Sequence, residues 1–375
     1  MSMRKTGPVL LLVGGGHAHL GVLADWVKHG SPRGRTILVT PHRHARYSGM
    51  IPGTVAGEYA IDEGTIDLAA LAKRAGAELV LDRCTAIEPS HRSIETEKGS
   101  RIAFDYCSID IGAVARAREV LGEDPRLLDV RPIASFISRL SEKCEGAGSE
   151  PNHIAVIGGG AGGVELAFAV RCRFEDRGTR VTLVAGEAGL LDGFSRRAKA
   201  LAERALRHDD IALVEQDARL EAGRLVAGMR TLEPVDLLIA SLGGAAPAWP
   251  GRGGLAVSQG GFIAVDRHQR SVSHPHILAA GDIAMRQDKM VPRSGVHAVH
   301  SGPVLASNLR RLLGGGGAMR SYRPRPASLY LVSTADGKAI ASYGIFAAHG
   351  RWAGWLKRWI DTRWIASFAK LSGRV

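Results

Sequence analysis

Cysteine is scarce in this chain, and long apolar segments are missing. The four cysteines among 375 residues show neither a CxxC pair nor the spacing of metal ligands. This pattern argues against a zinc site and predicts a reducing compartment. Apolar runs are far shorter than a membrane span, and the basic stretch 1–8 precedes only five apolar residues. We therefore expect no metal, no transmembrane helix and no secretory signal.

Acidic residues are outnumbered: 49 lysines and arginines stand against 37 aspartates and glutamates, for a net charge of +12. A basic balance predicts anionic partners such as nucleotides or lipid headgroups. A generally arginine-rich proteome explains it equally well. No basic tract is interleaved with aromatic residues in the way typical of nucleic-acid binding, so we expect no nucleic-acid partner.

A strand–glycine–helix pattern opens the chain. Five apolar residues, 9–13, precede three glycines, and a predicted helix follows. Gly14 allows a tight turn, Gly16 lets the backbone approach a phosphate, and the helix N-terminus offers unpaired N–H groups. His19 stands where the dinucleotide fingerprint has its third glycine. The next strand ends at Thr40, without the usual acidic partner for a ribose, so this pattern alone is a weak signal.

The same pattern recurs after residue 152, and there it is complete. A predicted strand, 153–157, is followed by Gly158, Gly160 and Gly163 and then by a predicted helix, 164–172. A full G-x-G-x-x-G between a strand and a helix predicts dinucleotide binding, although a turn that is merely tight is the alternative.

The dinucleotide that the second pattern would bind stays open between NADH and NADPH. Glu187 could reach a ribose hydroxyl, whereas Arg196 and Arg197 could bind a 2′-phosphate. Each half of the chain ends in a strand with a glycine exit, Gly112 in the first half and Gly243 in the second. Such an internal duplication brings two dinucleotides together, as hydride transfer between cofactors requires.

A third motif lies later in the chain, where the predicted strand 276–280 ends in Gly281 and Asp282. A carboxylate at a strand end can hydrogen-bond a ribityl hydroxyl, and the glycine admits the chain close to a pyrophosphate. An aspartate that only caps the following turn is the alternative. Elsewhere we expect an irregular loop over 41–53, a helix over 66–75 and a small antiparallel ribbon over 86–104.

Together, the three motifs resemble those of the FAD-dependent pyridine nucleotide-disulfide oxidoreductases, which have two dinucleotide-binding domains. Within that family, the chain resembles the type II NADH dehydrogenase branch. It is most similar to the flavoprotein unit that is sometimes fused ahead of selenophosphate synthetase. The matching segments are 14–19, 47–53 and 294–300. His19 is usual in that group.

The resemblance implies an α/β fold with two Rossmann-like domains. A discontinuous FAD domain would comprise 1–113 and 246–322, with an inserted NAD(P)H domain over 114–245 and a small C-terminal α+β segment over 323–375. The implied cofactors are FAD and NAD(P)H. The residues implied to bind them are Gly14, Gly16, His17, His19, Tyr47, Ser48, Gly49, Met50, Pro52, Gly112, Gly281, Asp282, Val296 and His297 for FAD, and Gly158, Gly160 and Gly163 for NAD(P)H.

The resemblance also implies roles in the chemistry. Tyr47 to Pro52 would line the isoalloxazine, and a helix opening at Val296 would point its positive end at the flavin O2, which favours the reduced flavin. Glu165 would lie near the nicotinamide, with a helix-start carboxylate as the alternative. His300 could protonate a quinone, with a plain surface histidine as the alternative. No cysteine stands where disulfide reductases or sulfide:quinone reductases need one.

The C-terminal stretch 350–368 contains four of the six tryptophans. On a helix, Trp352, Trp355, Leu356, Trp359 and Ile360 fall within an arc of about 140°. Cations flank the arc, namely Arg351, Lys357 and Arg358. This pattern is typical of a helix at a membrane surface, with a helix docked on the protein's own core or a homodimer seam as alternatives.

The favoured hypothesis is an FAD enzyme that passes hydride from NAD(P)H to a quinone-like acceptor. We expect it in the cytoplasm, with peripheral attachment to the inner membrane face. A soluble flavin reductase for selenium or another small oxidised acceptor is an alternative. A non-catalytic, nucleotide-sensing flavoprotein is an alternative from another class.

Overall fold

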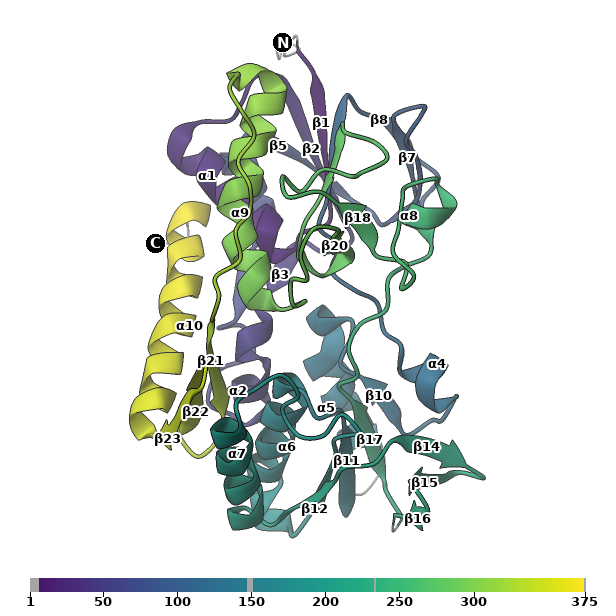
Figure 1. The fold of residues 1–375 in the computed structure, drawn as a ribbon, viewed down its shortest axis with the longest axis vertical. Helices are drawn as coiled ribbons and strands as arrows, with labels where there is room; N and C mark the ends of the chain where they lie inside the picture. Colours follow the sequence, from purple (N-terminus) through teal and green to yellow (C-terminus); the bar gives the residue numbers. More distant parts are fainter. Residues whose placement is uncertain (1–6, 147–150, 233, 374–375) are drawn as a thin grey trace.

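The computed structural model describes residues 7–146, 151–232 and 234–373, and two five-stranded parallel sheets organise it (Figure 1). The first sheet has the order β19-β9-β1-β2-β5. Four of the five residues in β1, its central strand, are buried, which explains the unbroken apolar sequence there. The strands are β1 (Val9–Val13), β2 (Arg35–Thr40), β5 (Ala77–Leu81), β9 (Tyr106–Ile109) and β19 (Ile277–Ala279).

The second sheet repeats this design with the order β10-β17-β11-β12-β13. In both sheets the strand that precedes a glycine turn lies at the centre, so the predicted duplication and fold class are confirmed. The chain passes between the sheets at Val114 and Ala245, which form an isolated antiparallel bridge. The strands are β10 (Leu127–Asp129), β11 (His153–Ile157), β12 (Arg180–Val184), β13 (Ile211–Val214) and β17 (Leu237–Ala240).

Two helices that begin at predicted cofactor motifs, α1 (His17–His29) and α9 (Gly295–Arg310), lie side by side along the first sheet (Figure 1). They approach closely because Gly21 faces Gly302: a Cβ on Gly21 would lie 3.2 Å from the Gly302 Cα. On the second sheet, α6 (Ala161–Arg173) and α7 (Arg196–His208) bury their apolar faces.

The segment 41–53 is more regular than we expect from its sequence. It forms a short strand β3 (His44–Arg46), a 3-10 turn (Ser48–Met50) and a buried helix α2 (Ile51–Val55) that packs against α6. The loop prediction is therefore wrong. Pro52 sits in the first turn of α2, where a missing N–H breaks no helical hydrogen bond.

The predicted helix 66–75 begins two residues later than expected. Thr65–Asp67 forms β4, which pairs with β3, and the Asp67 side chain then caps α3 (Leu68–Arg74) by accepting from Ala70 N at 2.9 Å. Gly281–Ile283 forms a 3-10 turn that leads into β20 (Ala284–Arg286). The antiparallel ribbon is present as β6 (Cys84–Glu88), β7 (Ser93–Thr96) and β8 (Arg101–Ala103).

The remaining elements connect these parts. They are α4 (Ala117–Leu121), the 3-10 turn Ile133–Ser135, α5 (Phe136–Gly146), the 3-10 turn Glu175–Arg177, β14 (Ala218–Glu221), β15 (Arg224–Ala227), β16 (Arg230–Thr231), α8 (Trp249–Arg252), β18 (Ile263–Val265), β20 (Ala284–Arg286) and the π-helical turn Arg311–Gly315.

The C-terminal segment is an antiparallel sheet followed by the longest helix, which runs along one side of the molecule (Figure 1). The sheet comprises β21 (Leu329–Ser333), β22 (Ala339–Tyr343) and β23 (Phe346–Gly350), and the helix is α10 (Arg351–Ser372). One face of α10 is docked on the protein and carries Ala353, Lys357, Asp361, Trp364 and Phe368. The prediction that Lys357 flanks a surface stripe is wrong, because this side chain points inward.

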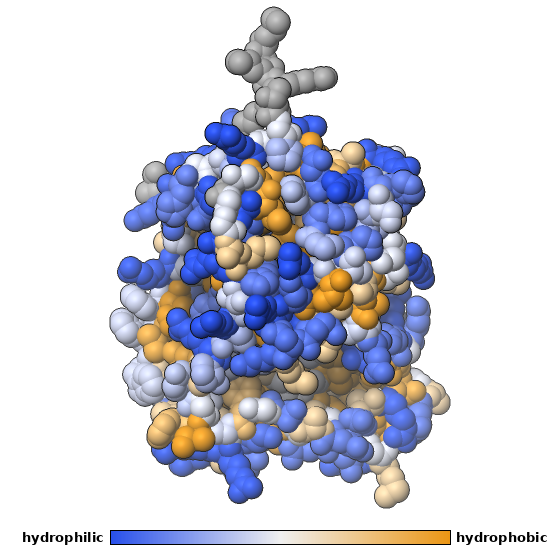
Figure 2. All heavy atoms as spheres, turned by 45° about the horizontal axis from the view of Figure 1, so that its top comes forward, coloured by the Kyte–Doolittle hydropathy of each residue, from blue (hydrophilic) through white to orange (hydrophobic). Residues whose placement is uncertain are grey.

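The molecular surface is mixed in character. Figure 2 shows one face, on which hydrophilic residues surround several smaller apolar patches. Within the described ranges, the model contains no helix that combines the length and the apolar character needed to cross a bilayer.

Candidate active site

The first glycine turn is shaped by close contacts that only glycine permits. Gly14 has φ +96°, and a Cβ there would lie 2.4 Å from the Asp110 carbonyl oxygen. A Cβ on Gly16 would lie 2.5 Å from the Asp110 carboxylate. Gly16 is also the N-cap of α1, so the cap residue has no side chain of its own, and the first turn contains no acidic residue. The positive end of this helix suits an anion such as a pyrophosphate.

His19 supports this turn from within the protein. Its side chain is fully buried, with Nδ1 2.7 Å from the Gly14 carbonyl oxygen and Nε2 2.9 Å from the Ser108 Oγ. Burial lowers the pKa of His19 to about 4, so the ring is neutral. Both ring nitrogens are engaged by the protein. The His19 side chain therefore supports the turn, and the predicted role of His19 in binding FAD stays a prediction.

Asp110, which the sequence motifs did not single out, connects two of them. The carboxylate accepts the N–H of His19 at 2.9 Å, and a Cβ on Gly281 would lie 2.4 Å from its Oδ1. The Asp110 carboxylate thus lies between the first glycine turn and the Gly281–Asp282 motif and contacts both. Burial raises the pKa of Asp110 to about 6, against the lowering effect of the His19 N–H and of His17. Its place at a strand end facing two glycines is the signal that could have revealed it.

The Gly281–Asp282 motif faces the segment between the two sheets. Gly281 has φ +68°, and the Asp282 Oδ2 lies 3.3 Å from a guanidinium nitrogen of Arg131. Arg131 was not anticipated from the sequence. Gly112, at the end of the first sheet, has φ +68° and open space where a Cβ would stand.

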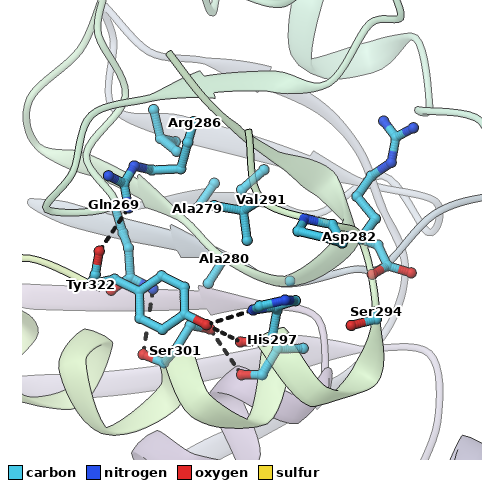
Figure 3. Close-up of a pocket in the computed structure, with 16 residues that line it drawn as sticks. Gln269, Ala279, Ala280, Asp282, Arg286, Val291, Ser294, His297, Ser301 and Tyr322 are labelled. Atoms are coloured by element: carbon cyan, nitrogen blue, oxygen red, sulfur yellow. Dashed lines mark hydrogen bonds between the residues drawn. The ribbon is translucent and has the colours of Figure 1, made fainter. Parts of the chain in front are cut away.

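A small cavity of about 40 Å³ lies behind Asp282 and the start of α9 (Figure 3). His297 is buried, and its Nδ1 is 3.0 Å from the Tyr322 hydroxyl. Val296 is half-buried, whereas His300 is exposed. Burial and the nearby Arg325 lower the pKa of His300.

Two buried polar atoms at these helix starts lack a hydrogen-bond partner among the described residues: Nε2 of His17, at the start of α1, and Oγ of Ser294, the N-cap of α9. Buried polar groups are normally satisfied, so such atoms indicate a missing ligand. Together with the glycine turn at the start of α1, they fit a bound dinucleotide such as FAD.

Tyr47 and its neighbours bring the flavin-side segment to α10. The Tyr47 ring centroid lies 4.3 Å from that of Trp364 and 5.7 Å from that of His17. Ser48 is close to the start of α9, because its Oγ would lie 3.6 Å from a Cβ on Gly295. Met50 and Pro52 are buried inside the protein, so they shape this segment and offer no surface to a ligand.

In the second glycine turn, Gly158 and Gly163 pack against the backbone, whereas Gly160 faces open space. A Cβ on Gly158 would lie 2.4 Å from the Ser241 carbonyl oxygen, and one on Gly163 would lie 1.9 Å from the Gly158 carbonyl oxygen. A Cβ on Gly160, by contrast, would meet nothing within 4 Å. Gly160 is the N-cap of α6, whose first turn also lacks an acidic residue. This turn leaves room for a pyrophosphate above Gly160.

Glu165, in α6, is part of a buried charge cluster. Its Oε1 accepts the Ser333 N–H at 2.9 Å and lies 3.5 Å from the Lys357 Nζ. Burial raises the pKa of Glu165, against the lowering effect of Lys357 and the Ser333 N–H. The side chain reaches across to α10 and β21, so it does more than favour the helix dipole.

Lys357 joins three parts of the chain at one point. Its Nζ donates to the Gly49 carbonyl oxygen at 3.0 Å and lies 3.3 Å from the Asp361 Oδ2, as well as contacting Glu165. Burial lowers the pKa of Lys357, but Glu165 and Asp361 outweigh it and hold the pKa above its ordinary value. We call Glu165, Lys357 and Asp361 the lysine cluster. It links the predicted flavin side at Gly49 with the predicted nicotinamide side at Glu165.

Two glycine turns at the centres of twin parallel sheets, each followed by a helix whose N-cap is a glycine, define a two-dinucleotide flavoprotein fold. The sequence pattern of the pyridine nucleotide-disulphide oxidoreductases matches residues 9–302. The chain therefore belongs to this family, and it is an FAD-dependent NAD(P)H oxidoreductase. A comparison with curated proteins finds no match.

Solved structures share the fold at low sequence identity. The sulfide:quinone oxidoreductase of the hyperthermophilic bacterium Aquifex aeolicus aligns with a TM-score of 0.80 and 16% identity, over 97% of this chain and 92% of that one. NDH2 of Plasmodium falciparum, in complex with NADH, aligns at 0.78 and 14%, over 98% of both chains. The water-forming NADH oxidase of Lactobacillus brevis aligns at 0.73 and 20%, over 90% and 75%.

Gly160 and Gly163 of the second turn should respond differently to replacement by alanine, one in NADH affinity and the other in the free energy of unfolding. Gly160→Ala should change the free energy of unfolding by less than about 1 kcal/mol and weaken NADH binding at least tenfold, because its Cβ enters the space for the pyrophosphate. Gly163→Ala, the matched control, should lower the free energy of unfolding by about 1–3 kcal/mol because its Cβ meets backbone. Denaturant unfolding and NADH titration measure both. Unchanged NADH affinity in Gly160→Ala would exclude this turn as the binding site.

The raised pKa of Asp110 predicts that the stability of the protein depends on pH. Because the folded protein favours the protonated carboxyl group, the stabilisation from Asp110 is fully present below pH 4. About 3 kcal/mol is lost as the pH rises to 6. Asp110→Asn should lack this loss, so the variant should gain stability relative to the wild type between pH 4 and 7. Asp176→Asn, at an exposed position, is the control. If the difference in the free energy of unfolding between the wild type and Asp110→Asn stays constant from pH 4 to 7, the raised pKa of Asp110 is contradicted.

Proposed function

We propose that the chain oxidises NADH and passes the electrons to a quinone-like acceptor at a membrane surface. The observation that carries the proposal is the lysine cluster, in which Lys357 contacts both Gly49 and Glu165. Bound FAD would supply the hydride and electron chemistry. The chain itself would supply position, charge and protons.

Lys357 and Glu165 suit these roles for different reasons. The ammonium group stays protonated and lies beside the Gly49 carbonyl, so it provides a fixed positive charge where negative charge would develop. The raised pKa of Glu165 suits it to hold a proton or to orient a nicotinamide.

Sulfur chemistry is disfavoured by the environment of the two buried thiols. Cys84 and Cys107 lie in the apolar core behind the first sheet, and burial raises the pKa of Cys84 to about 12. A buried, neutral thiol is a poor nucleophile. The similar solved structures include a sulfide:quinone oxidoreductase and a water-forming NADH oxidase, which act on a quinone and on oxygen, as well as a persulfide reductase. The cysteine positions favour the former.

Acidic groups around the loop after β12 favour NADH over NADPH. Asp217 Oδ1 accepts the Glu187 N–H at 3.0 Å, and Glu215 Oε1 accepts the Leu190 N–H at 2.9 Å. In this fold that loop adjoins the adenosine ribose of the dinucleotide. The carboxylates of Glu187, Glu215 and Asp217 would repel a 2′-phosphate there. The Glu187 carboxylate could instead accept a hydrogen bond from a ribose hydroxyl.

A membrane surface is favoured by the exposed side of α10. Trp352, Trp355 and Trp359 are 54%, 65% and 46% exposed, and we call them the tryptophan face. The rings of Trp355 and Trp359 stack, and the Arg363 guanidinium lies 5.3 Å from the Trp359 ring centroid. The one acidic residue of α10, Asp361, is buried, so its exposed side is purely cationic. Exposed tryptophans among cations match an anionic lipid surface.

The reaction is tested by stopped-flow measurement of both half-reactions. NADH should bleach the wild-type flavin faster than NADPH does, and a soluble quinone should restore the flavin absorbance. Glu165→Gln should slow reduction by about ten- to a hundredfold. Glu175→Gln, an exposed carboxylate beyond the same helix, should leave it unchanged. Reduction at the wild-type rate in Glu165→Gln would remove Glu165 from the reaction, and failure of quinones to reoxidise the flavin would overturn the acceptor.

The membrane contact is tested by vesicle sedimentation. Replacing all three tryptophans of the tryptophan face by serine should weaken binding to phosphatidylglycerol vesicles by roughly a hundredfold, because each ring loses about 1 kcal/mol of apolar burial. The inward face of α10 is untouched, so the fold should persist. Met229→Ser, a fully exposed apolar side chain elsewhere, should bind as the wild type does. Equal binding by the triple variant argues against the contact.

A further inference from the structure

A cavity of about 400 Å³ lies beside the tryptophan face and is not used by the proposed reaction. Its walls are the segment 56–59 after α2, Cys172 of α6, the end of β21 with the turn to β22, and the first two turns of α10. Its size is in the range of small-ligand sites. Lys357 forms part of its lining, but its ammonium group is already engaged in the lysine cluster.

The cavity carries an excess of positive charge. Lys338, Arg351 and Arg358 line it, against a single carboxylate, Glu58. Lys338 is paired with Asp336, and Arg358 donates to the Glu58 carbonyl oxygen at 3.2 Å. Arg351 has no ion-pair or hydrogen-bond partner among the residues that the structure describes. One guanidinium at the cavity is therefore available to an anion.

The start of α10 adds to this charge. Arg351 and Gly354, both in its first turn, line the cavity, and the N-cap is Gly350, which has no side chain to cap the helix. The first turn contains no acidic residue. The positive end of a 22-residue helix and its free N–H groups thus act together with Arg351 and Lys338.

Trp355 belongs both to the cavity lining and to the tryptophan face. The cavity therefore opens at the level where the tryptophan face would meet lipid. We propose that it binds the phosphodiester headgroup of an anionic phospholipid, with Arg351 as the main phosphate-binding cation and Lys338, which is paired with Asp336, as a second cation beside it. This inference rests on the proposed membrane contact, to which it adds selectivity for a headgroup.

The test compares two variants that lose the same charge. The cavity pair, Lys338→Gln with Arg351→Gln, and the surface pair, Arg363→Gln with Lys370→Gln, each remove two cations near α10. Sedimentation is measured with phosphatidylcholine vesicles and with vesicles that also contain phosphatidylglycerol. Thermal unfolding and flavin content check that both pairs are folded. Diffuse attraction predicts equal losses of binding to the charged vesicles, whereas the proposal predicts a loss at least tenfold greater in the cavity pair.

Three outcomes overturn the inference in distinguishable ways. Equal losses in the two pairs would leave the membrane contact standing and exclude the headgroup site. If the wild type binds no vesicles, the membrane contact and the lipid site both fail. In the third outcome, the wild type binds free glycerophosphoglycerol or inorganic phosphate but no vesicles, and the cavity pair binds neither phosphate compound. The cavity would then take a soluble phosphate, and the lipid assignment would be wrong.

Discussion

The buried ammonium group of Lys357 is the interaction on which the functional half of the structure depends. Removing such a charge from water costs several kcal/mol, which its partners must offset. Two of these partners, Gly49 and Glu165, come from distant parts of the chain, and the third, Asp361, lies one turn away on the same helix. The cluster therefore forms only when α10 docks against the rest of the protein. It sets the predicted flavin-side segment, the predicted nicotinamide-side helix and the C-terminal helix in one arrangement.

The two glycine turns reach the same shape by different physical means. In the second turn, Gly163 lets the helix pack directly on the backbone of Gly158. In the first turn, the bulkier His19 replaces that contact with hydrogen bonds to Gly14 and Ser108, and Asp110 binds the helix N-terminus from below. The FAD-side turn is thus held by a buried polar network, which makes it sensitive to protonation in a way that the second turn is not.

The parts that sequence could predict are those that depend on neighbouring residues. Strand, glycine turn and helix are adjacent in the chain, so both nucleotide turns and the twin sheets were predictable. The role of Lys357 was not predictable from the sequence. Its partners Glu165 and Gly49 lie about 200 and 300 residues away, and its helix position alone suggested a surface cation. The i, i+4 spacing of Lys357 and Asp361 on the docked face of α10 was the available signal. The segment 41–53 was also mispredicted, because its burial against α6 outweighs its poor local propensity.

Our main proposal is that the lysine cluster links a flavin site at Gly49 with a nicotinamide site at Glu165. The most direct measurement is a crystal structure determined with FAD and NAD⁺ both bound. The account predicts FAD on the turn at Gly14 to Gly16 with its isoalloxazine beside Gly49 and Lys357, and the nicotinamide against Glu165 and stacked near the flavin. A structure in which either dinucleotide avoids its glycine turn, or in which the two rings lie apart with Lys357 contacting neither side, would contradict it.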